Sequence, residues 1–128
     1  MNQRQLGAFG EKIAIKYLQG KGYKILDKNF FKKEVLGPRT GEVDIVAKKD
    51  DIVSFIEVKT LRNLITLIEP EEKINFFKKK KLIKTAQAWL LKNRISLDAK
   101  WQIDIISIKI DLNTKRAKIR HFENAISQ

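Results

Sequence analysis

The sequence predicts an α/β protein in which a mixed central sheet is flanked by helices, in the element order αβββαββ. Two stretches repeat apolar residues at helical spacing. A pair of β-branched runs is joined by a short polar turn, and a second pair of expected strands follows the second helix. The 128 residues suffice for one hydrophobic core and are too few for two. We therefore expect a single domain over residues 1–128.

The first half of the chain predicts one helix and one short strand. Residues 3–20 carry the first helical repeat, which Gly20 and Gly22 end. Residues 23–30 are expected to form a strand. Residues 36–41 contain two glycines and a proline, so a loop follows.

The middle of the chain predicts a hairpin. Residues 42–48 and 52–59 are β-branched runs, and residues 49–51 between them are expected to form a tight turn. Residues 60–70 predict an irregular segment that ends at Pro70.

The second half predicts a long helix and a second pair of strands. Residues 71–93 have helical spacing, and Glu71 and Glu72 suit the positive end of the helix dipole. Residues 101–110 and 116–122 are expected to be strands joined by a turn.

The composition excludes several classes of function. There is no cysteine, which removes disulfides, thiol catalysis and cysteine metal sites. No apolar run approaches the roughly 18 residues of a membrane span, and the first residues lack the apolar core of a secretory signal. We therefore expect a cytoplasmic protein without a membrane partner.

The charge points to an anionic partner. Lysine and arginine number 27 against 15 aspartates and glutamates, giving a net charge of +12 and a pI near 10.0. Most of these cations are lysines, which suit phosphate better than base edges. The composition favours binding to a nucleic-acid backbone, without separating a nuclease from a passive binder.

Acidic residues gather on the predicted hairpin. If residues 50–51 form a two-residue turn, Asp44 lies opposite Glu57, and Glu42 lies opposite Lys59. Facing carboxylates repel each other, and a divalent cation such as Mg²⁺ or Mn²⁺ offsets that cost. Asp44 and Glu57 are therefore candidate metal ligands. Lys59 would lie beside the ion, to act on a water or on the charge of a phosphate.

An ordinary sheet face is the alternative. Glu42 and Lys59 would then form a cross-strand ion pair, with Asp44 and Glu57 on a solvated surface. Against this, the run 52–59 is apolar on both faces, which predicts burial, and buried charges need partners. Spacing alone leaves both interpretations open.

The same residues carry a resemblance to a known family. Gly41-Glu42-Val43-Asp44-Ile45-Val46, followed by Phe55-Ile56-Glu57-Val58-Lys59, looks like the D…ExK signature of the PD-(D/E)xK nucleases. Nearly the whole chain resembles the YraN family of predicted endonucleases. The further positions that carry this resemblance are Gly10-Glu11, Ala14, Tyr17-Leu18, Gly22-Tyr23, Asn29, Lys78, Leu82, Ala86, Leu90, Asp104, His121 and Asn124-Ala125.

The resemblance implies a restriction-endonuclease-like fold, akin to archaeal Holliday-junction resolvases, and hydrolysis of phosphodiester bonds in structured or branched DNA. It implies that Asp44 and Glu57 bind the metal, that Lys59 is catalytic and that Glu11 is an accessory acid. From helical spacing alone, Glu11 lies at the edge of an apolar stripe, where solvent exposure is the commoner situation.

Three further residues are assigned to the nucleic-acid interface: Lys78, Arg39 and Glu42. Lys78 lies on the inward stripe of its helix, so its ammonium either reaches water or points to the acidic hairpin. Arg39 lies in the loop before the acidic strand, a position that suits a phosphate contact. A homodimer would suit a two-fold symmetric junction. A non-catalytic nucleic-acid-binding module on the same fold is the alternative function.

Overall fold

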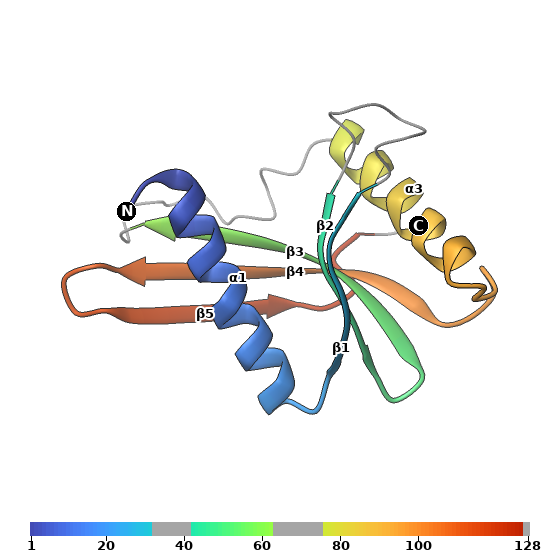
Figure 1. Ribbon diagram of the computed structural model, residues 1–128, viewed down its shortest axis with the longest axis horizontal. Coiled ribbons are helices and arrows are strands. Elements are labelled where there is room, and N and C mark those ends of the chain that lie inside the picture. The colour runs from blue at the N-terminus through green and yellow to red at the C-terminus, as the bar shows by residue number, and fades with distance from the viewer. Residues whose placement is uncertain (32–41, 63–75, 127–128) are drawn as a thin grey trace.

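The structure is a computed structural model that describes residues 1–31, 42–62 and 76–126 (Figure 1). These residues form two helices and a five-stranded sheet with the strand order β1-β2-β3-β4-β5. Neighbouring strands are antiparallel except β3 and β4, which are parallel. The elements are α1 (Gln3–Gly20), β1 (Lys24–Phe31), β2 (Glu42–Lys49), β3 (Ile52–Arg62), α3 (Phe76–Lys92), β4 (Trp101–Asp111) and β5 (Arg116–Phe122). The predicted mixed sheet flanked by helices is confirmed.

Helix α1 covers one face of the sheet (Figure 1). Its first turn is fixed by a capping box, in which Asn2 and Gln5 exchange side-chain to backbone hydrogen bonds. Its buried stripe packs on isoleucines of β2, β3 and β4. The approach to β3 is close at Gly10, because a Cβ atom there would lie 1.9 Å from Oγ1 of Thr60. Glycine at this position therefore sets the distance between α1 and the sheet.

Helix α3 covers the opposite face. Leu82, Ala86 and Leu90 share a core there with Val53 and Phe55 of β3. Trp89 of α3 packs edge-on against Phe55, with 5.6 Å between the ring centroids.

The two cores show which way the side chains of β3 point. Val53 and Phe55 belong to the core under α3, whereas Ile56 belongs to the core under α1. Because side chains alternate along a strand, Glu57 and Lys59 lie on the face that α3 covers. Residues 53–57 are all buried, as predicted for a strand that is covered on both faces.

The predicted hairpin register is confirmed from Lys49–Ile52 to Ile45–Ile56. The irregular segment predicted to begin at residue 60 is wrong for residues 60–62. They continue β3, because this strand pairs with β4 as far as Arg62–Ile110. The predicted helix over residues 71–93 is found as α3, and residues 71–75 lie outside the described part. Neither described helix is long and apolar enough to cross a membrane.

Candidate active site

Asp44 lies where the registered pairing of β2 with β3 ends. The last registered pair is Ile45–Ile56, one residue before Asp44 and Glu57 would face each other. Instead, Oδ2 of Asp44 accepts a hydrogen bond of 2.7 Å from the backbone N–H of Val58. This bond holds the Asp44 carboxylate against β3, beside the residue that follows Glu57.

Glu57 is the centre of a partly buried charge cluster. Glu57 is 7% exposed, and its Oε1 lies 3.1 Å from Nζ of Lys59 and 3.0 Å from Nζ of Lys78. A carboxylate at such a depth needs charged or hydrogen-bonding partners, and two ammonium groups share one of its oxygens. Lys59 comes from the same strand and Lys78 from α3, so this ion cluster joins the helix to the sheet.

The two lysines differ in acidity although they share one carboxylate. Burial lowers the pKa of Lys59, the neighbouring Lys78 lowers it further, and Glu57 opposes both effects. Burial also disfavours the charged form of Lys78. Its hydrogen bond with Lys59 and the charges of Glu57 and Asp44 outweigh burial and raise the pKa of Lys78. Lys59 is therefore the lysine that gives up its proton more easily.

The influence of Asp44 on Lys78 also shows how the acidic residues are related. Both Asp44 and Glu57 act on the Lys78 ammonium, and Asp44 is bonded to the backbone between Glu57 and Lys59. The structure thus brings Asp44, Glu57, Lys59 and Lys78 into one neighbourhood. Their chemical roles stay predictions.

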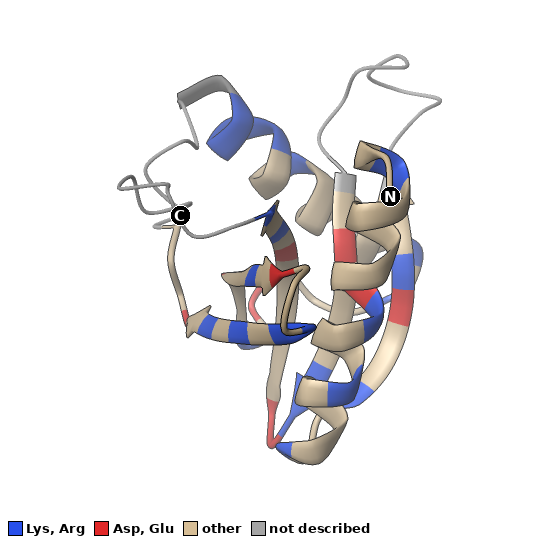
Figure 2. Ribbon diagram, turned by 90° about the vertical axis from the view of Figure 1, so that its left-hand side faces the viewer, with Lys and Arg blue, Asp and Glu red and all other residues tan. Residues whose placement is uncertain are grey.

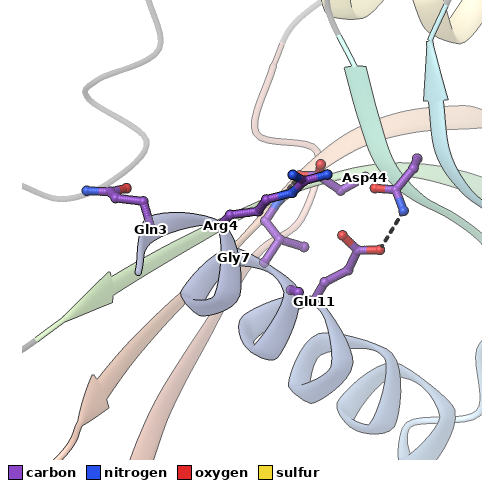
Figure 3. A pocket seen from close by; sticks show the side chains of 8 residues that line it. Gln3, Arg4, Gly7, Glu11 and Asp44 are labelled. Carbon is purple, nitrogen blue, oxygen red and sulfur yellow. Dashed lines mark hydrogen bonds between the residues drawn. The ribbon is translucent and has the colours of Figure 1, made fainter. Parts of the chain in front are cut away.

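A pocket of about 540 Å³ opens beside Asp44, between the first half of α1, the end of β1, the start of β2 and Val58 of β3. Asp44, Glu11 and Arg4 line it, whereas Glu57 and Lys59 are not among its lining residues. Figure 3 shows the Arg4 side chain extending from α1 toward Asp44. Asp44 therefore stands between this pocket and the ion cluster at Glu57.

Glu11 faces this pocket from one helical turn after Gly7. Its Oε1 accepts a hydrogen bond of 3.1 Å from the Asn29 side chain on β1 (Figure 3). The family resemblance implied that Glu11 is an accessory acid, and the structure puts it in the same pocket as Asp44. Sequence analysis missed Arg4. The signal was present, because residues 4 and 11 are seven apart and so share a helix face.

Two predicted interface residues are not tested. Arg39 lies outside the described residues. Glu42 begins β2 and pairs with Phe31 of β1, and the structure does not describe its side chain. The predicted pairing of Glu42 with Lys59 lies beyond the last registered pair of β2 and β3, and the registered neighbour of Lys59 is Ser107 on β4.

A second polar cluster lies on the α1 face of the sheet. Asp104 is fully buried, and its Oδ2 lies 2.8 Å from Nε2 of His121. Its Oδ1 accepts hydrogen bonds from Gln102 and from the backbone N–H of Asn124, both of 2.9 Å. Asp104, His121 and Glu123 each offer one atom of a kind that binds metals, and these three atoms lie within 4.8 Å of one another. The group could hold a metal ion.

The hydrogen bonds of Asp104 also have a structural effect. They attach the chain after β5 to β4, and a backbone bond from Ala125 to Ile103 follows. Ile126 is thereby placed in the core under α3, with 2% exposure. The resemblance included Asp104 and His121, but no sequence pattern showed that they touch.

A mixed sheet with a helix on each face, and an Asp…Glu-x-Lys arrangement at the end of the β2–β3 pairing, define a restriction-endonuclease-like α/β protein. Comparison with known sequences gives the family. Residues 10–108 match the uncharacterised protein family UPF0102, also called the YraN family, and the chain belongs to it.

Similar UPF0102 proteins match over almost their whole length. One from Alkaliphilus oremlandii is 39% identical over 122 residues, covering 95% of this chain and 97% of the relative. One from Clostridioides difficile is 38% identical over 125 residues, covering 98% and 99%. One from Clostridium botulinum is 37% identical over 122 residues, covering 95% and 94%.

Proposed function

We propose that this protein is a metal-dependent nuclease that hydrolyses phosphodiester bonds in structured or branched DNA. The observation that carries the proposal is the cluster at Glu57. A buried carboxylate holds two lysines of different acidity, and a second carboxylate is fixed to the adjacent backbone. Titratable groups that perturb one another in this way are typical of catalytic sites.

The donor atoms fit a hard divalent cation such as Mg²⁺ or Mn²⁺. Asp44 and Glu57 supply carboxylate oxygens. Val58, which lies between Glu57 and Lys59 on β3, supplies a backbone carbonyl. Glu57 binds the Lys78 ammonium, and Asp44 is held on the backbone N–H of Val58, the residue next to Glu57, so two acidic side chains belong to adjacent positions of this site. When bound there, such an ion polarises the phosphate and makes a water more acidic.

The two lysines suit different tasks. Because burial lowers its pKa, Lys59 is the better proton acceptor for an attacking water. Lys78 keeps its charge to higher pH, which suits binding of a phosphate oxygen and of the charge that develops on it. On the pocket side, Arg4 is placed for a phosphate, and Glu11, held by Asn29, serves as the accessory acid.

The test is cleavage of branched, flapped and duplex DNA with Mg²⁺ or Mn²⁺. Glu57→Gln and Lys59→Ala should each lower the rate by about 10²–10⁴-fold, and EDTA should abolish cleavage. Lys84→Ala, which removes an exposed lysine from the same helix as Lys78, is the matched control and should cleave like the wild type. Equal cleavage by all four proteins would mean that a contaminant does the work, and the proposal would be wrong.

A non-catalytic DNA-binding module is the second candidate, and the net charge of +12 favours it equally. Such a module would bind DNA in a salt-sensitive, metal-independent way and would tolerate Asp44→Asn. Metal-dependent cleavage that Asp44→Asn abolishes would exclude it.

A further inference from the structure

We propose that the phosphate backbone of the nucleic acid runs from the Glu57 cluster across β4 to the outer edge of the sheet, along a basic strip formed by Lys109, Arg116, Lys118 and Arg120. The nature of the partner rests on the proposed function. The course of the backbone rests on the strand register and on the exposure of these four side chains.

The register places the strip on the same face of the sheet as Glu57. Directly paired residues point to the same side, and Lys59, Ser107 and Arg120 form one row across β3, β4 and β5. The next row contains Lys109 and Lys118. The opposite face of β5 is occupied, since Ile119 packs in the core under α1 and His121 contacts Tyr17.

The strip is open to a ligand. Arg116, Lys118 and Arg120 are exposed, and Lys109 is partly exposed. Figure 2 shows the alternation of basic and other residues along the strand that leads to the C-terminus. The guanidinium of Arg120 lies 4.9 Å from the ring centroid of Phe122, which fixes its position. Core packing by α3 involves the other end of this face, around Phe55 and Ile103.

Protection of a sheet edge explains only part of this pattern. Charged residues on an edge strand hinder pairing with other chains, and β5 is an edge strand. Lys109, however, lies on β4, an inner strand, directly opposite Lys118. Like charges in such a pair repel each other, so the pair is costly until an anion lies between or above them.

A buried hydroxyl in the same row points the same way. Ser107 is 1% exposed and lies between Lys59 and Arg120. Among the described residues, its Oγ is the one buried side-chain polar atom without a hydrogen-bond partner. Buried polar atoms normally have partners, so this hydroxyl is left for a water or a ligand group, which would have to displace the atoms that cover it.

The dimensions suit several phosphates. Lys59 and Arg120 are two strands apart, about 10 Å, and Arg116 lies four residues further along β5. The strip thus extends about 17 Å from the cluster. Consecutive phosphates of one B-DNA strand lie further apart than the axial rise of about 3.4 Å, because the strand winds around the axis, so the strip faces several phosphates but fewer than about five. Lysine ammonium groups and arginine guanidinium groups both bind phosphate oxygens, so the four cations suit contacts with the backbone.

The test compares two triple variants that lose the same charge. One is Arg116→Gln/Lys118→Gln/Arg120→Gln. The control is Lys12→Gln/Lys16→Gln/Lys21→Gln, which removes three exposed lysines from α1 and the residue after it. Affinity for a labelled duplex and for a branched DNA is measured in EDTA over a range of salt concentrations, so that no cleavage is needed.

The strip variant should bind at least tenfold more weakly at about 0.1 M salt. Its slope of log K against log salt should be shallower by up to about 2.7. The control should lose no more than about threefold. Equal losses in both variants, an unchanged strip variant, or a wild type that binds no DNA would each overturn the inference. So would polyglutamate that displaces DNA as well as unlabelled DNA does, because the strip would then accept any acidic chain.

Two further measurements keep the result clear. If thermal melting shows that the triple variant does not fold, the single variant Lys118→Gln is tested, with an expected change in slope of about 0.9. Cleavage by the wild type is assayed separately. If the strip variant loses DNA binding and the wild type cleaves no DNA, the strip is supported and the proposed nuclease activity is contradicted. If the wild type cleaves DNA and the strip variant binds DNA normally, the nuclease activity is supported and the strip is contradicted.

Discussion

Lys59 and Lys78 show how position separates two chemically identical side chains. Both ammonium groups lie about one hydrogen bond from Oε1 of Glu57. Lys59 follows Glu57 on β3, where burial favours its neutral form, and Lys78 also receives the attraction of Asp44. Helical spacing left open whether Lys78 reaches water or the acidic hairpin. The structure shows that it reaches the hairpin.

This difference predicts an order of titration. On raising the pH, Lys59 should lose its proton below the usual lysine pKa of 10.5, and Lys78 should lose its proton above it. The stabilisation from Lys78 is therefore present below pH 10.5 and is lost as the pH rises through its raised pKa. NMR titration of the lysine ¹³Cε signals, assigned with Lys59→Arg and Lys78→Arg, measures both values.

Glu57→Gln is the control for this titration. It removes an effect that raises both pKa values, so both lysines should titrate at lower pH in this variant. Lys59 titrating after Lys78 in the wild type would contradict the assignment of Lys59 as the proton acceptor.

At the scale of elements, the contact between α1 and β3 determines where Glu11 and Arg4 stand relative to Asp44. Gly10 allows the helix backbone to lie directly on Thr60. Gly10→Ala should destabilise the protein by about 1–3 kcal/mol, because the new methyl group would overlap a side chain in a packed strand. Urea denaturation measures the change.

Gly7 offers a matched control in the same helix. A Cβ atom there would meet nothing within 4 Å, so Gly7→Ala should be neutral or stabilise the protein by roughly 0.5–1 kcal/mol. Adding Thr60→Ala to Gly10→Ala removes two of the three nearest atoms and should restore part of the loss. Equal effects of Gly10→Ala and Gly7→Ala would show that the close approach is not what glycine provides.

The elements that sequence predicted well are those fixed by local chemistry. A two-residue turn sets the register of its hairpin, so the pairing of residues 45–49 with 52–56 followed from the turn alone. Residues 60–62 were missed because their strand conformation comes from parallel pairing with β4, distant in the chain. The contact of Asp104 with His121 was missed for the same reason, since it depends on how β4 and β5 are paired.

At the scale of the molecule, some lysines are paired with a carboxylate, but positive charges outnumber negative ones. Glu57 offsets part of the charge of Lys59 and Lys78, while other lysines and arginines of α3 and β5 are exposed. Figure 2 shows the basic residues along these two elements. A net charge far from zero destabilises the compact state by self-repulsion. Dissolved salt relieves this repulsion, as an anionic partner would.

Raising NaCl from about 0.02 to 0.3 M should therefore stabilise the protein, because the Debye length falls below the spacing of most surface charges. We expect about 1 kcal/mol, or roughly 4 °C in Tm, measured by thermal melting. Glu57 is buried and its two lysines are partly buried, so salt weakens these pairs less than it screens the fully exposed cations. The variant Lys12→Gln/Lys16→Gln/Lys21→Gln has a net charge lower by three and should gain less from the same salt. A Tm that falls with salt in the wild type would mean that ion pairs, and not repulsion among the excess cations, dominate its electrostatic energy.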